Sequence, residues 1–97
     1  MATPSPIERW YRNRCDGNWE HQWGISIESL DNPGWRVKID LQGTPAESKT
    51  LARDKIERGD ENWIQYWAAE KKFEIACGPL NLSEALEIFA AWYASQS

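Results

Sequence analysis

Apolar and polar residues alternate along residues 24–41, and this is the clearest pattern in the chain. Ile25 and Ile27 are apolar with polar neighbours, and the alternation resumes from Trp35 to Leu41. Successive side chains of a strand point to opposite faces, so the pattern predicts two strands with one buried face and one wet face. Between them, Asn-Pro-Gly-Trp predicts a type II turn in which Gly34 has a positive φ. The stretch therefore predicts a β-hairpin.

Helical spacing of apolar residues marks both ends of the chain. Near the N-terminus, Ser5 is the expected N-cap, Pro6 the first helical residue, and Glu8 the partner of Ser5 in a capping box. Asp16-Gly17 predicts the end of this helix. Its apolar face consists of Ile7, Trp10, Tyr11 and Cys15. This pattern predicts an amphipathic helix that packs on the predicted sheet.

The C-terminal helix is predicted by a longer apolar stripe. Asn81 and Glu84 form a second capping-box pattern at its start. The stripe consists of Leu82, Ala85, Leu86, Phe89, Trp92 and Tyr93. Spacing of this kind predicts a helix that buries one face against the rest of the domain.

The segment between the hairpin and the C-terminal helix is harder to assign. Residues 63–70 and 72–77 read as strands joined by a turn around Lys71. Residues 49–58 are ambiguous between a polar strand and a short helix, and favour a strand because helical spacing leaves too few apolar residues for a face. We expect one α+β domain over residues 1–97: a four-stranded antiparallel meander flanked by an N-terminal and a C-terminal helix, in the order α-β-β-β-β-α.

The composition and charge of the chain make some classes of function less favoured than others. The chain carries 15 acidic and 11 basic residues, so its net charge of −4 disfavours binding to nucleic acid or to an anionic membrane. No apolar run reaches the length of about 18 residues that spans a bilayer, and the N-terminus lacks the apolar region of a secretory signal. We therefore expect a cytoplasmic protein in which Cys15 and Cys77 are reduced and independent.

The stretch CDGNWEHQWG, residues 15–24, holds the only histidine and the densest group of polar and aromatic side chains. Asp16, Glu20 and His21 could supply three metal ligands, but a single histidine and no C-x-x-C pair argue against zinc, and no cofactor is expected. The same three residues could act as acid–base groups of a small enzyme. Cys15 falls on the apolar helix face, where a free cysteine behaves as a small hydrophobe.

Charge and tryptophan suggest a protein interface instead. Residues 16–35 contain no lysine or arginine, so their acidic side chains would face a cationic partner unless they are ordinary solvated residues. Those side chains are Asp16, Glu20, Glu28 and Asp31. Trp19 fits a structural role and an interface role equally well. Trp63 and Trp67 share one face of a predicted strand, while Trp10, Trp35 and Trp92 fit the core.

Residues 10–41 resemble the bacterial immunity protein 53 family of polymorphic toxin systems. The resemblance rests on WY in the first helix, on CDGNWEH after it, on the glycine before the first strand and on LDNPGW at the hairpin. Shorter pieces fit further on, namely NWI, KF, CGPLNL and IFAAW, so the resemblance extends over most of the chain except residues 42–61.

The resemblance implies a cytoplasmic immunity protein that binds and occludes a cognate toxin domain and is not an enzyme. By analogy, an acidic inhibitor would suit a nuclease toxin. The residues that we expect to contact the partner are Asp16, Trp19, Glu20, His21, Glu28 and Asp31. Two alternatives stay open at this point, an acid–base enzyme built on Asp16, Glu20 and His21 and a stand-alone protein-interaction adaptor.

Overall fold

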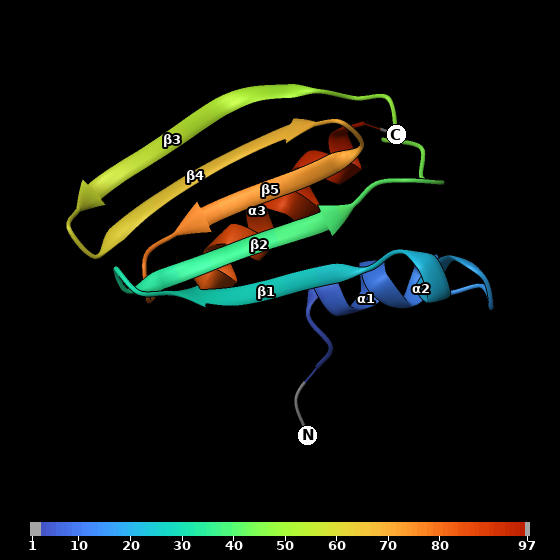
Figure 1. Ribbon diagram of the computed structural model, residues 1–97, viewed down its shortest axis with the longest axis horizontal. Helices are drawn as coiled ribbons and strands as arrows, with labels where there is room; N and C mark the ends of the chain where they lie inside the picture. The colour runs from blue at the N-terminus through green and yellow to red at the C-terminus, as the bar shows by residue number, and fades with distance from the viewer. Residues whose placement is uncertain (1–2, 97) are drawn as a thin grey trace.

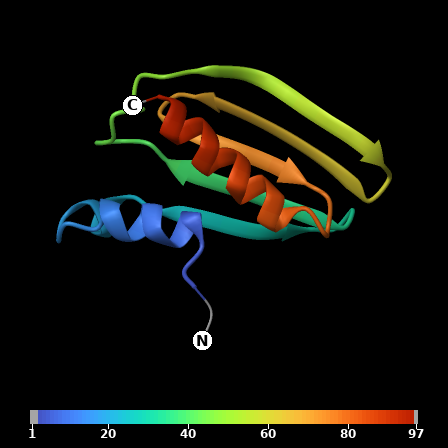
Figure 2. The same cartoon turned by 180° about the vertical axis from the view of Figure 1, so that it is seen from behind.

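The computed structural model describes residues 3–96, so residues 1–2 and 97 of the predicted domain lie outside the described range. One antiparallel sheet carries the helices on one of its faces (Figures 1 and 2). The elements are α1 (Pro6–Arg14), α2 (Trp19–Gln22), β1 (Ile25–Leu30), β2 (Gly34–Asp40), β3 (Leu51–Gly59), β4 (Asn62–Ala69), β5 (Lys72–Cys77) and α3 (Leu82–Ser95). The predicted α+β class with an antiparallel sheet and a helix at each end is confirmed.

The prediction of a four-stranded meander is wrong in strand number, because all five stretches that favour a strand in the sequence form one, and it is wrong in strand order. The sheet has five strands in the order β1-β2-β5-β4-β3, so β2 pairs with β5 and not with the strand that follows it. β3 lies at an edge and has one neighbour, β4. Only Leu51 and Ile56 of β3 are partly buried, because an edge strand needs few apolar residues. The polar sequence of residues 49–58 is explained by this position.

The core lies between the sheet and the two longer helices. α3 crosses the middle of the sheet and α1 lies beside α3 (Figure 2). Trp10 of α1 packs against three aromatic rings in edge-to-face geometry. The centroid of its ring lies 5.0 Å from that of Phe89, 5.5 Å from that of Tyr93 and 5.9 Å from that of Trp19. Trp10 is 7% exposed, which confirms the predicted core role.

The two predicted capping boxes have different outcomes. The N-terminal one is confirmed, because Glu8 accepts from the backbone N–H of Ser5 at 2.8 Å and Ser5 caps Glu8 in return. The C-terminal one is wrong, since Asn81 is the N-cap but makes no side-chain capping bond. Its amide instead accepts from the N–H of Trp63 and donates to Asn62, and so ties the start of α3 to β4.

The prediction that Gly34 has a positive φ is also wrong. Among the described glycines, only Gly17 and Gly43 have a positive φ. Gly34 begins β2 and lies against the neighbouring strand, where a Cβ atom would stand 2.3 Å from the carbonyl oxygen of Cys77. Glycine is required at this position by the close approach of two backbones and not by the turn.

Candidate partner-binding site

Residues 15–24 do not form a plain loop, because they include the single-turn helix α2. The Asp16 carboxylate accepts hydrogen bonds from the backbone N–H groups of Asn18 and Trp19, both at 2.9 Å. The Glu20 carboxylate accepts from the N–H groups of Asp16 at 2.9 Å and Gly17 at 2.8 Å. The Asp16 carboxylate thus pairs the first N–H group of α2, that of Trp19, and the two carboxylates together pair backbone N–H groups of the link between α1 and α2.

These contacts lower the pKa of both carboxyl groups. The pKa of Asp16 falls mainly through the N–H of Trp19 and then that of Asn18. The pKa of Glu20 falls mainly through its own backbone N–H, with those of Asp16 and Gly17 adding to the effect. Both carboxylates bind backbone N–H groups of residues 16–19. Two of the three residues in the acid–base hypothesis, Asp16 and Glu20, therefore have a structural role.

Replacing Glu20 with glutamine tests this structural use. A depressed pKa means that the ionised carboxylate stabilises the fold above the unfolded-state pKa, and that this stabilisation is lost as pH falls through the folded-state pKa. We expect Glu20→Gln to lower the melting temperature at pH 7 and to leave it unchanged near pH 2, where both forms are neutral. Thermal unfolding followed by circular dichroism at the two pH values measures the difference. An equal loss at both would contradict the electrostatic origin.

Trp19 packs inside the domain. It is 8% exposed, its indole N–H donates to the carbonyl oxygen of Gln42 at 2.7 Å, and its ring lies 6.3 Å from that of Tyr11. Of the two roles that the sequence left open, this environment favours the structural one. The neighbouring His21 and Trp23 are exposed.

The other two predicted acidic contacts lie elsewhere. Glu28 and Asp31 are exposed, Glu28 on β1 opposite Arg36 and Asp31 in the turn between β1 and β2. That turn is at the opposite end of β1 from α2 (Figure 1), and a strand rises about 3.3 Å per residue, so roughly 20 Å separates Asp31 from the residues before β1. The structure therefore brings Asp16 and Glu20 together and leaves Asp31 apart from them.

The sheet face opposite the helices is open, and it faces the viewer in Figure 1. Trp63, Gln65 and Trp67 of β4 point to this face, since Ile64 and Ala68 between and beside them are buried in the core. The prediction that Trp63 and Trp67 share one strand face is confirmed. This open aromatic face was not among the predicted contact residues.

Trp67 is covered by arginines of its own chain. The guanidinium of Arg53 lies 4.2 Å from the ring centroid of Trp67, and that of Arg36 lies 5.3 Å from it. Arg36 also donates to Glu74 at 2.8 Å, and this hydrogen bond lowers the pKa of Glu74. Cation–π contact and an ion pair together fill the space over Trp67.

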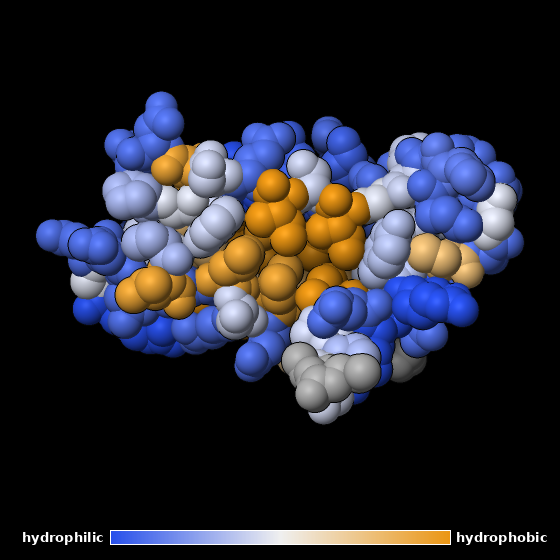
Figure 3. All heavy atoms as spheres, turned by 90° about the horizontal axis from the view of Figure 1, so that it is seen from below, coloured by the Kyte–Doolittle hydropathy of each residue, from blue (hydrophilic) through white to orange (hydrophobic). Residues whose placement is uncertain are grey.

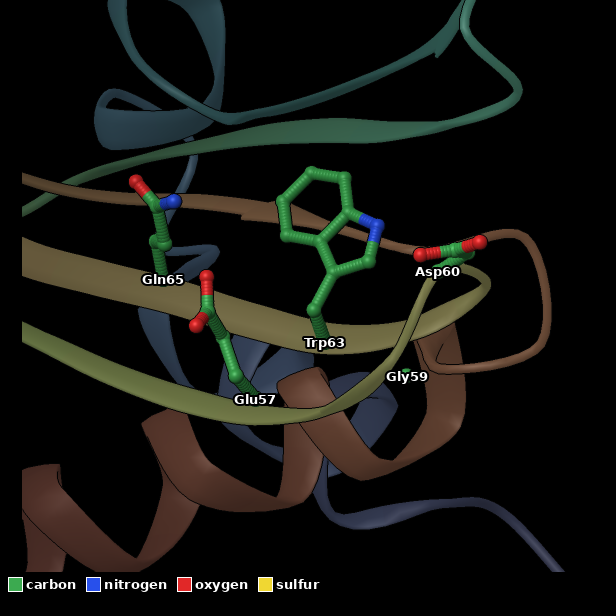
Figure 4. Close-up of a pocket in the computed structure, with 5 residues that line it drawn as sticks. All are labelled: Glu57, Gly59, Asp60, Trp63 and Gln65. Carbon is green, nitrogen blue, oxygen red and sulfur yellow. The ribbon is translucent and has the colours of Figure 1, made fainter.

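Trp63 lines a pocket of about 470 Å³ at the end of the sheet where β3 turns into β4. Its other lining residues are Glu57, Gly59, Asp60 and Gln65. The side chains of Glu57, Asp60 and Gln65 lie on the side of the sheet away from α3, with the Trp63 ring between Glu57 and Asp60 (Figure 4). The Trp63 indole N–H donates to no group within residues 3–96.

A second surface is apolar. Between α1 and the edge strand β1 lies a groove of about 380 Å³, lined by Ile7, Tyr11, Ile25 and Ile27 together with Glu8 and Gly24. Apolar side chains form a continuous patch on this side of the molecule (Figure 3), and Ile27 is 45% exposed. Contiguous exposed apolar area on a small domain is typical of protein-binding surfaces.

The described part of the chain offers little for covalent or metal chemistry. Cys15 donates its thiol to the carbonyl oxygen of Tyr11, whereas Cys77 is fully buried and its pKa is raised by that burial. Within residues 3–96, no three histidine, cysteine or acidic side chains are grouped as a metal site. None of the helices in that range is long and apolar enough to cross a membrane.

Comparison with known proteins identifies the class. A family model described as Immunity protein 53 matches residues 5–94, and so includes the surfaces described above. The chain is therefore an immunity protein by class. It belongs to the immunity protein 53 family, as its sequence resemblance implied. Searches of curated proteins and of solved structures found no match.

Proposed function

We propose that this protein neutralises a cognate bacterial toxin domain by binding and occluding it, without catalysis of its own. The observation that carries the proposal is the family match over residues 5–94. The open face of the sheet and the apolar groove beside β1 support it, because both present aromatic or aliphatic side chains to solvent. A nuclease is the toxin class that the acidic composition favours.

Co-expression with the cognate toxin domain tests the proposal. Cells that carry the toxin domain alone should stop growing, and the added immunity protein should restore growth and co-purify with the toxin domain. An inactive point variant of the toxin domain should still bind, because occlusion does not depend on toxin activity. Absence of both rescue and complex formation would refute neutralisation by binding.

The acidic residues Glu28 and Asp31 are proposed to steer the toxin domain toward the protein. Replacing both with lysine should lower the association rate at least tenfold at low salt and leave folding intact, since both side chains are exposed. Raising the salt concentration from about 0.05 to 0.5 M shortens the Debye length from roughly 14 to 4 Å and should slow wild-type association. Surface plasmon resonance measures both effects.

A charge-matched variant serves as the control for this experiment. Glu70→Lys with Glu87→Lys changes the net charge by the same amount on other exposed positions. If both double variants slow association equally, overall charge is responsible and not the surface around Glu28. An association rate that ignores salt and both reversals would contradict electrostatic steering altogether.

A further inference from the structure

We propose that the pocket around Trp63 receives a basic side chain of the toxin domain, an arginine or a lysine. The inference rests on the proposed function and adds to it one contact and its chemistry. It concerns a surface other than the predicted acidic group of Asp16, Glu20, Glu28 and Asp31. Three features of the pocket favour such a side chain: the aromatic ring of Trp63, the carboxylates on either side of it, and the contrast with Trp67.

The residues that line the pocket are of the types that bind an organic cation: an indole ring, Trp63, and two carboxylates, Glu57 and Asp60. The indole of Trp63 is the best aromatic partner for a cation, and carboxylates beside the ring add charge-assisted hydrogen bonds. Glu57 is the register partner of Trp63 on the adjacent strand, and Asp60 follows in the turn. Figure 4 shows the two carboxyl groups on either side of the Trp63 ring, and Gln65 completes the wall on the Glu57 side.

The acidic charge of Glu57 and Asp60 is only partly compensated within the protein. Lys55 pairs with Glu57 at 2.8 Å, but both side chains are more than half exposed, and exposed pairs of this kind contribute little stability. Arg58, the nearest arginine in sequence, is held elsewhere by two hydrogen bonds to Glu84 and one to Asn62. Asp60 forms no ion pair with the described residues.

Trp67 shows what such a ring binds on this same face. It lies on the same strand and the same side as Trp63, and two arginines of its own chain cover it. Trp63 has no cation over its ring within residues 3–96, although carboxylates flank it. At Trp67 the cation over the ring comes from the protein itself. At Trp63 the same position over the ring can accept a guanidinium or ammonium group of another molecule.

Titration with a small probe tests the pocket without the toxin domain. N-acetyl-arginine amide should shift the indole N–H signal of Trp63 in a saturable manner in nitrogen–proton correlation spectra, and its neutral isostere N-acetyl-citrulline amide should not. The Trp63 signal is assigned by its loss in Trp63→Phe. The Trp67 signal should stay in place. Glu57→Gln with Asp60→Asn should weaken arginine binding at least fivefold. Equal shifts with both probes, or none, would overturn the pocket chemistry.

Binding of the pocket variants to the toxin domain tests whether a basic side chain of the toxin domain occupies the pocket. Glu57→Gln with Asp60→Asn should weaken the complex about tenfold, and Trp63→Ala at least as much. The control with the same charge change is Glu70→Gln with Glu87→Gln, which should bind as wild type. The amide variants change only exposed side chains, so they keep the test valid if Trp63→Ala unfolds.

The two proposals fail in different ways. If wild-type protein binds the toxin domain and the pocket variants bind equally well, the basic side chain at Trp63 is refuted and the proposed function stands. If wild-type protein does not bind the toxin domain, the proposed function fails and the occupant fails with it.

Discussion

Replacing Trp10 with alanine should reduce the free energy of unfolding by about 3–5 kcal/mol, which is most of the stability of many small domains. Trp10 contacts Phe89 and Tyr93 of α3 and Trp19 of α2, so its removal leaves a cavity at the junction of three helices. Urea denaturation followed by far-ultraviolet circular dichroism measures the loss.

Two companion variants make the result for Trp10 specific. Trp23→Ala removes an indole that is 37% exposed, and we expect a loss below about 1 kcal/mol. Trp10→Phe keeps a ring in the core and removes a buried indole N–H that has no hydrogen-bond partner within the described residues. Its cost should therefore fall well below that of Trp10→Ala. Equal losses for alanine at positions 10 and 23 would contradict the packing shown here.

Gly34→Ala should cost about 1–3 kcal/mol, because the new Cβ atom would meet backbone and not a movable side chain. The carbonyl oxygen of Cys77 would lie 2.3 Å from it, so β2 and β5 must separate at this point. We expect faster amide hydrogen exchange at the Trp35 and Cys77 end of this strand pair, in addition to a lower melting temperature.

Gly59→Ala is the matched control for Gly34→Ala. Gly59 also lies in a strand, but no atom stands within 4 Å of the position of its Cβ, and its φ is not positive. The substitution should change stability by less than about 0.5 kcal/mol. A neutral result at both positions would show that the two backbones can adjust without cost.

Much of the secondary structure could be predicted from sequence, because burial leaves a periodic pattern in the residues. The alternation over residues 35–41 predicted the buried Val37, Ile39 and Leu41, and the capping box placed the start of α1. The pattern indicates which face of a strand is buried but not which strand lies beside it. The pairing of β2 with β5 was therefore missed.

Weak apolar patterns explain why residues 49–58 could be assigned to a strand only with an alternative open, and why α2 was not predicted. β3 is an edge strand whose outer side meets solvent, and α2 is a single turn held by the carboxylates of Asp16 and Glu20. The pocket at Trp63 depends on the register between β3 and β4, which sequence does not state. Its one visible signal was the pair of tryptophans on a wet strand face, Trp63 and Trp67.

The pairing of β2 with β5 also has a consequence for synthesis on the ribosome. The hairpin of β1 and β2 is complete at Asp40, but β2 gains its second neighbour only after Cys77 has been added. At roughly 5–20 residues per second, the hairpin waits on the order of seconds with one edge unpaired. Contacts this distant along the chain slow folding. β5 is the middle strand of the sheet, so a nascent chain that ends before β5 cannot complete the sheet, and the domain can fold only after translation has passed Cys77.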